Sequence, residues 1–343
     1  MRARSCKAVL LVAALMAAAL AGFPAQGGAQ GRIPVKMAQA TLVLAYAPLF
    51  VARDLKFFEA EGVDLDLQLV TGVVGSQALA GGTVDFDVDS SNNVVRIAER
   101  GIDALTIQGL LGTMTMNLVV RREVAQKKGV GPGSPLAQRF GALKGLTIGI
   151  TTPGAAGDTY TRWMLKQAGL DPVKDVNIVQ IGTPDALQAA MGQGRVDAFM
   201  LSAPTPERLE RDGVGLILIK NSAGDTPEFR QFLHTVVATR RGYAERNPEA
   251  VQRVTRAIAR GANVLLDQTE EGKKTLQKTF PRIPPEVLSL SVDNMKPGFL
   301  RNGRMSEEHW KNLSQVFQDV GITKGPLETR EGKLWTNRYL PSF

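Results

Sequence analysis

Apolar and polar positions between residues 144 and 200 follow two periods in turn, which predicts strands that alternate with helices. The apolar runs typical of buried strands are residues 146–150, 176–181 and 195–200. Helical spacing occupies residues 160–168 and 183–191, and each junction before a helix is polar. Strands that alternate with helices predict a parallel sheet. Such sheets place ligand sites beyond the carboxyl ends of their strands, so the polar loops are the place to look for function.

The same order of elements occurs earlier in the chain. Strand patterns cover residues 38–45, 63–70 and 83–88, and helical patterns cover residues 48–60 and 76–80. Val84-Asp85 and Val196-Asp197 stand at equivalent places, each after a helix that ends in a Gly-rich turn. The repeated order predicts two lobes of like design.

The remaining pattern divides the chain between these lobes. A strand at residues 113–120 closes the first lobe, so a boundary is expected near Val120, and a strand at residues 234–239 carries the chain back. The helical patterns after it are residues 251–266, 270–279, 285–294 and 306–320. They add no strand and are expected to pack on the first lobe. The expected division is 1–29 for a leader, 30–120 with 234–343 for lobe 1, and 121–233 for lobe 2.

The first residues have the form of a secretory signal peptide. Arg2, Arg4 and Lys7 precede an apolar run at residues 8–21, and small residues lead up to Ala29, where cleavage is expected. A membrane anchor is the alternative, but the run is shorter than the roughly 20 apolar residues that span a bilayer. The 343 residues suit two domains better than one core.

Composition removes several classes of function. The only cysteine, Cys6, lies in the leader, so the mature chain has no thiol for disulfides, metal binding or nucleophilic catalysis. The formal net charge of +8 falls to +5 without the leader, which carries three basic residues and no acidic one. The basic residues of the mature chain form no stripe with stacking aromatics, so nucleic acid is not an expected partner.

Signatures of catalysis are missing as well. His234 and His309 are the only histidines, and they lie on different expected elements, so no metal site is expected, and packing or a solvated face explains each. The loop at residues 149–157 is rich in Gly but lacks the Lys-Ser/Thr pair of a phosphate-binding loop. No Gly-x-Ser-x-Gly elbow occurs. The sequence therefore favours a binding protein over an enzyme, with no cofactor.

Hydroxyls and amides near the expected helix starts form the candidate site. The candidate ligand-binding residues are Tyr46, Thr71, Ser76, Ser90, Asn92, Thr113, Asn117, Thr151, Thr152, Thr183 and Ser202. Helix N-termini carry free N–H donors and partial positive charge, so several that converge would bind an oxyanion without a buried cation. The alternative for each residue is a helix cap, or a half-buried core side chain for Tyr46. Asp158 either caps a helix or selects a cationic group.

Several segments together resemble a known family. They are residues 47–65, 78–85, 143–150, 189–197 and 246–251. In this order they resemble solute-binding proteins of ABC importers, in the nitrate, sulfonate and taurine group of type II periplasmic binding proteins. The resemblance implies an α/β fold with two lobes, mainly parallel sheets, crossing strands near residues 117–121 and 234–240, and a solute held between the lobes. It also implies a periplasmic monomer that presents its closed form to the transmembrane subunits of an ABC permease.

The resemblance does not identify the solute, nor does it decide whether the closed form is recognised by a permease or by a receptor. The expected cleft loops contain no Lys or Arg, which disfavours a small, strongly hydrated anion and leaves a sulfonate, a carboxylate or a heterocycle. A sensor subunit that signals to a receptor is the alternative to an importer component. Pyrimidine-precursor synthases have a similar fold, but they depend on several histidines and a cysteine-rich segment that this chain lacks.

Overall fold

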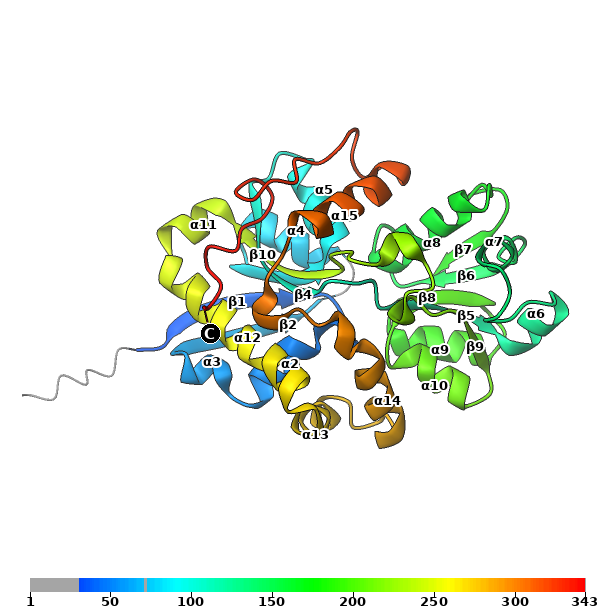
Figure 1. Ribbon diagram of the computed structural model, residues 1–343, viewed down its shortest axis with the longest axis horizontal. Helices are drawn as coiled ribbons and strands as arrows, with labels where there is room; N and C mark the ends of the chain where they lie inside the picture. The colour runs from blue at the N-terminus through cyan, green and yellow to red at the C-terminus, as the bar shows by residue number, and fades with distance from the viewer. Residues whose placement is uncertain (1–30, 71–72, 343) are drawn as a thin grey trace, which may run out of the picture. The chain divides into compact units, whose positions relative to one another are not determined.

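The protein is described from a computed structural model that covers residues 31–70 and 73–342, so the expected signal peptide at residues 1–29 lies outside it. The chain from Ile33 to Phe343 forms one compact unit. Its strands form two five-stranded sheets, each with helices on its faces (Figure 1). The two-lobed α/β fold expected from the sequence is confirmed.

The two sheets have the same strand order. The first runs β2 (Val63–Leu69), β1 (Ile33–Gln39), β3 (Phe86–Ser90), β10 (Thr235–Arg240), β4 (Ala104–Leu111). The second runs β7 (Asn177–Gln180), β6 (Thr147–Ile150), β8 (Ala198–Ser202), β5 (Met116–Arg121), β9 (Gly215–Ile219). In each sheet the fourth strand is antiparallel to its neighbours, and the other strands share one direction.

The repeated Val-Asp pair has the same role in both sheets. The N–H of Asp85 donates to Lys36 O at 2.8 Å, and the Lys36 N–H donates back to the Asp85 carboxylate at 2.9 Å. Asp197 repeats this exchange with Thr147, at 2.7 and 3.0 Å. Each carboxylate thus satisfies a backbone N–H of the neighbouring parallel strand, β1 or β6, which explains why the pair recurs before β3 and before β8.

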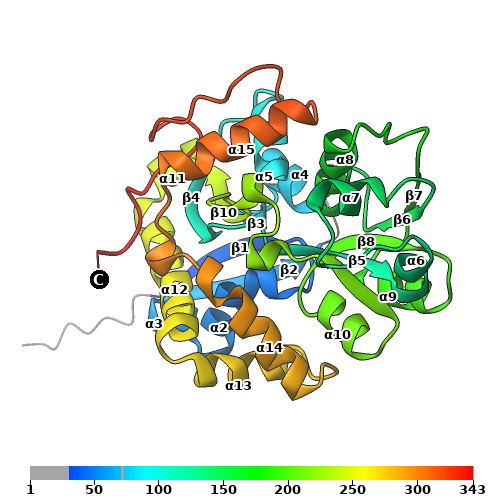
Figure 2. The same cartoon turned by 45° about the vertical axis from the view of Figure 1, so that its right-hand side comes forward.

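The helices fall into two groups by position in the chain. Those before residue 220 are α2 (Ala47–Asp54), α3 (Phe57–Ala60), α4 (Val74–Gly81), α5 (Ser91–Ala98), α6 (Arg122–Lys127), α7 (Leu136–Gly141), α8 (Ala156–Gln167), α9 (Pro184–Gly192) and α10 (Thr205–Arg211). Those after it are α11 (Arg241–Arg246), α12 (Pro248–Asp267), α13 (Thr269–Thr279), α14 (Pro285–Met295) and α15 (Glu307–Asp319). As expected, α12 and α13 pack on α2 of the first lobe. Figure 2 shows α14 reaching the second lobe beside α10.

The beginning of the first lobe differs from expectation. The first strand is Ile33–Gln39 rather than residues 38–45, and residues 40–43 form a loop instead. Pro34 is tolerated there because β1 pairs only with β2 at that point, and pairing with β3 begins at Met37. The helix expected at residues 48–60 is broken into α2 and α3 by Lys56, whose φ is 59°.

The strand expected to close the first lobe lies in the other sheet. β5 pairs with β8 and β9 of the second sheet, and β10, which follows β9, pairs with β3 and β4 of the first. The expected crossings at residues 117–121 and 234–240 fall within β5 and β10, which are paired strands of the two sheets. The chain passes between the sheets just before these strands, at residues 112–115 and 220–234, which we call the crossing segments. The expected division into lobes stays a prediction.

Candidate functional site

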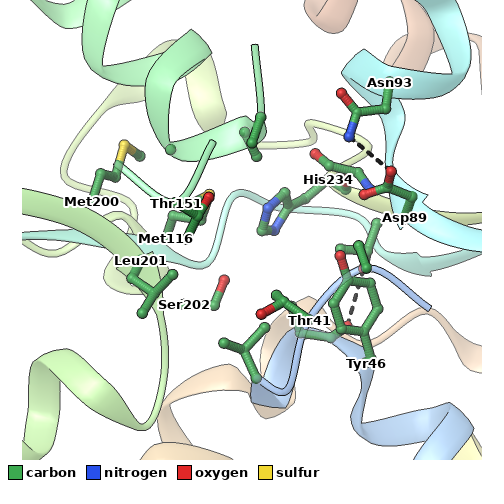
Figure 3. Close-up of a pocket in the computed structure, with 18 residues that line it drawn as sticks. Thr41, Tyr46, Asp89, Asn93, Met116, Thr151, Met200, Leu201, Ser202 and His234 are labelled. Atoms are coloured by element: carbon green, nitrogen blue, oxygen red, sulfur yellow. Dashed lines mark hydrogen bonds between the residues drawn. The ribbon is translucent and has the colours of Figure 1, made fainter. Parts of the chain in front are cut away.

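A small cavity of about 50 Å³ lies where the two lobes meet. Thr41, Tyr46 and Asp89 line it from the first lobe, and Thr151 and Ser202 line it from the second. In Figure 3 the ring of His234 lies between these two sets of side chains. At roughly 10–15 Å³ for each water-sized volume, the cavity has room for a head group of a few heavy atoms.

Strand ends place these side chains. Asp89 is the last residue but one of β3, Thr151 follows β6, and Ser202 ends β8. These are parallel strands, so their carboxyl ends meet at one edge of each sheet, and the two edges face the same cavity. The position agrees with the sequence-based expectation that ligand binding would occur beyond the strand ends.

The N-terminus of α8 forms part of the second-lobe wall. Ala155, Ala156 and Gly157 line the cavity, so the free N–H groups and partial positive charge of this helix are near it. Asp158, whose role the sequence left open, accepts hydrogen bonds from Gly154 N at 2.8 Å and Arg162 Nε at 2.5 Å. It therefore stabilises the first turn of the helix and is absent from the lining.

The first-lobe wall carries a buried acid. Asp89 accepts hydrogen bonds from Ser90 N at 2.6 Å and Asn93 Nδ2 at 2.7 Å. Burial nevertheless raises the pKa of Asp89 to about 7. Burial and the charge of Asp89 raise the pKa of Asp87, two residues earlier on the same strand, well above its ordinary value. Burial, then Asp89 and Asp87, also raise the pKa of Tyr46.

His234 joins the two crossing segments and reaches the cavity. Thr115 N donates to its Nδ1 at 3.4 Å, and Thr115 Oγ1 lies 3.2 Å from the same atom. Burial lowers the pKa of His234 to about 3, so the ring is neutral at physiological pH. Because Nδ1 accepts the Thr115 N–H, the ring proton belongs on Nε2, which makes that nitrogen a donor.

Four of the candidate residues line the cavity: Tyr46, Ser90, Thr151 and Ser202. Two of their hydroxyls are used within the protein. Ser90 Oγ donates to His234 O at 3.2 Å, and Ser202 Oγ lies 3.3 Å from Thr115 Oγ1. Tyr46 and Thr151 have no such side-chain bond among the described residues. They are the candidate side chains most available to a ligand.

Two further candidates line neighbouring hollows. Thr183 borders an outer hollow of about 450 Å³ and caps α9, where its Oγ1 accepts from Ala186 N at 3.3 Å. Ser76 borders a hollow of about 130 Å³ on the other side. It lies inside α4 rather than at its start, and its Oγ donates to Val73 O at 3.0 Å.

The structure does not bring the remaining candidates to the cavity. Asn92 donates to Gly154 O at 3.2 Å, and Thr113 donates to Phe229 O at 3.1 Å within the crossing segments. Asn117 lies within β5 and donates to Glu207 Oε1 at 2.9 Å. Thr152 is absent from the lining, since the turn after β6 presents Thr151 instead. Thr71 lies outside the described residues.

Sequence reasoning missed several lining residues. The polar ones are Thr41, Asp89, Asn93, His234 and Thr235. Asp89 and Asn93 fell within a segment interpreted as a helix cap, and Thr41 within an expected strand. The basic side chains of the cleft were also missed, because Arg96 and Arg208 lie within helices and Arg282 lies in the turn between α13 and α14, outside the expected loops. Arg208 and Arg282 line the outer hollow, and Arg96 lines the smaller one.

Features of a membrane span and of a metal site are both missing from the described residues. Within residues 31–70 and 73–342, no helix combines the length and apolar character of a membrane span. The same residues contain no group of three or more His, Cys, Asp or Glu placed to hold a metal ion.

Comparison with known sequences places most of the chain in one family. The model of the NMT1-like family matches residues 29–278. The Bacillus subtilis (strain 168) protein YtlA, named as an expected binding protein, is 22% identical over 295 residues, which cover 84% of this chain and 83% of YtlA. Relatives named as binding proteins agree with the expectation that the chain is not an enzyme.

Solved structures share the fold. The periplasmic aliphatic sulphonate binding protein SsuA from Escherichia coli matches with a TM-score of 0.66 and 18% identity, over 90% of this chain and 99% of SsuA. The ligand binding component of an ABC-type import system from Staphylococcus aureus matches with a TM-score of 0.66 and 14% identity, over 86% of this chain and 94% of that one. At these identities the likeness concerns the fold alone.

Proposed function

Because the chain belongs to the NMT1-like family, we propose that it is the solute-binding component of an ABC importer. It binds a small organic solute between its lobes, in the periplasm, as a monomer, and presents the closed form to the permease. The proposal is supported by the resemblance of the sequence to importer binding proteins and by the fold shared with SsuA and the Staphylococcus aureus component.

One observation supports the proposal most directly, which is a cavity lined from both lobes. A solute that contacts Tyr46 and Asp89 on one side and Thr151 on the other favours the conformation in which the lobes are together. Ligand binding can bias closure only through such different contacts in the open and closed states. The cavity therefore offers a route from binding to a change of shape that a permease can recognise.

A thermal-shift screen of the purified mature chain tests the proposal. The set contains sulfonates, aliphatic and aromatic acids, amides, amino acids and pyrimidines. A solute that binds only the folded state raises the melting temperature in proportion to the logarithm of its concentration. We expect at least one saturable hit, confirmed by calorimetry, with the solute recovered unchanged. Conversion of the solute to a product, or no hit in any class, contradicts the proposed function.

A further inference from the structure

The inner cavity presents an acidic side chain and no Lys or Arg among the described residues that line it. Among the described residues that line it, Asp89 is the only acidic side chain, and neither Lys nor Arg is present. Arg96 and Arg208 belong to the neighbouring hollows, where Arg96 donates to Thr159 Oγ1 at 3.2 Å and Arg208 lies 3.7 Å from Asp212. An oxyanion in the cavity would therefore meet a buried carboxylate without a cation to offset the repulsion.

A second buried acid lies two residues before Asp89 on the same strand. Asp87 and Asp89 are 0% and 1% exposed, and both lie on the same face of β3 because strand side chains alternate. Neither carboxylate oxygen of Asp87 has a hydrogen-bond partner among the described residues. Asp87 lies beside Gly75 of α4 and is absent from the cavity lining, so among the described residues Asp89 is the acid that a solute in the cavity can contact.

The opposite walls supply donors instead. The N-terminus of α8 brings N–H groups to the second-lobe side, and within residues 31–70 and 73–342 the Nε2–H of His234 has no hydrogen-bond partner. A head group that fits must therefore give a hydrogen bond on one side and accept hydrogen bonds on the other. It must also be small, because the cavity measures about 50 Å³.

We infer that the solute of the proposed function carries an uncharged carboxamide-type head group, whose N–H donates to Asp89 and whose carbonyl faces the N-terminus of α8 and His234. The inference names the substrate class of the proposed site and rests on that function. Ala40 and Thr41 line both the cavity and the outer hollow, where Leu42, Leu69 and Phe280 provide apolar surface. The head group thus carries an apolar extension that occupies this outer hollow.

Matched head groups on one carbon skeleton test the inference. Benzamide offers a donor and an acceptor, benzoate only acceptors, and benzamidine only donors; the three cyclohexane analogues repeat the series. Calorimetry at pH 8 with the wild-type chain should rank each amide at least about tenfold tighter than its carboxylate and its amidine. A carboxylate or an amidine that binds as tightly as its amide overturns the inference, whether or not any variant folds.

Substitution of the acid gives an independent readout. Asp89→Asn should weaken amide binding by about tenfold or more and improve carboxylate binding, while Asp66→Asn on the exposed face of β2 changes neither. Unchanged amide binding by Asp89→Asn overturns the inference. In the wild type, carboxylate binding should strengthen from pH 8 to pH 5 as Asp89 gains a proton, because the repulsion is then removed; carboxylate binding that is the same at both pH values overturns the inference. If the protein binds taurine or nitrate but no amide, the inference about the head group is wrong and the proposed function stands. If it binds none of the probes, the proposed function is contradicted as well.

Discussion

Glu207 shows how a buried acid outside the cavity makes stability depend on pH. It lies on α10, is 6% exposed, and accepts from Asn117 Nδ2 at 2.9 Å through Oε1, while Oε2 has no partner among the described residues. Burial raises the pKa of Glu207 to about 7, against opposing effects from its own backbone N–H, Asn117 and Lys220. The folded protein therefore holds a proton that the unfolded chain releases at lower pH.

Glu207→Gln should remove this pH dependence. The contribution of the protonated acid is complete below the unfolded pKa of about 4.5 and is lost as pH rises towards 7, so wild-type stability falls across that window. Relative to the wild type, the variant should gain about 3 kcal/mol between pH 4.5 and pH 8, at 1.36 kcal/mol per pKa unit. Urea unfolding at both pH values measures the change. Glu245→Gln, at an exposed position of α11, serves as the control and should show no such gain. If the free energy of unfolding changes equally with pH in both variants, Glu207 is not the source of the pH dependence.

Single residues were the hardest level to predict from the sequence. The capping role considered for Thr183 is confirmed, because a cap depends only on the residues next to it. Asn117 and Thr113 were assigned to the site, yet their partners are Glu207 and Phe229, which lie about a hundred residues away in sequence. Local pattern carries no information about such partners. The burial of Asp89 likewise depends on β10 and on the second lobe.

At the scale of elements, the packing of α12 on α2 depends on a close approach of backbones. Gly261 of α12 faces the carbonyl of Pro48 and the N–H of Ala52. A Cβ at Gly261 would clash with the carbonyl oxygen of Pro48 and would lie 2.9 Å from Ala52 N. These are backbone atoms, which cannot move aside as a flexible side chain can. The long helix therefore lies flat on α2 only because residue 261 has no side chain.

Gly261→Ala should destabilise the protein by about 1–3 kcal/mol. The gain in helix propensity, about 1 kcal/mol, is smaller than the cost of separating two packed helices. Gly192→Ala in α9 is the matched control, since a Cβ there has no neighbour within 4 Å, and it should be neutral or slightly stabilising. Denaturant unfolding with both variants measures the difference. Equal stability of the two variants would mean that α2 and α12 can shift apart without cost.

Most elements could be predicted because their patterns are local. The helices α12 to α15 and the strand β2 lie within a few residues of their expected bounds, since their apolar spacing is strong. The pairing partners of β5 and β10 were not predictable, because an apolar strand fits either sheet equally well. The break between α2 and α3 was also missed, since the apolar spacing continues through Lys56.

At the scale of the whole molecule, two ion pairs connect the lobes at the rim of the cleft. Arg211 of α10 lies 2.7 Å from Glu286 of α14, and Arg282 lies 2.5 Å from Asp185 of α9. Both pairs are largely exposed, so water and salt weaken them. They are available only when the lobes are together, which makes them small contributors to closure.

Glu286→Gln should weaken solute binding by about two- to fivefold at low salt, with the effect fading as ionic strength rises. The reason is that the closed conformation loses one rim contact while the cavity is unchanged. Asp267→Asn is the control, because it removes the equally exposed pair with Arg301, which joins α12 to the loop before α15. Calorimetry of both variants at low and high salt gives the comparison. Identical affinities for both variants would show that the rim pair does not contribute to closure.

The return of β10 to the first sheet also determines when that sheet can form during synthesis of the chain. The gap between β3 and β4 is filled only by β10, which ends at Arg240. A growing polypeptide that extends past β4 but not yet to β10 contains the other four strands of the first sheet and still lacks the strand that joins them. The first sheet thus stays unfinished until most of the chain has been synthesised.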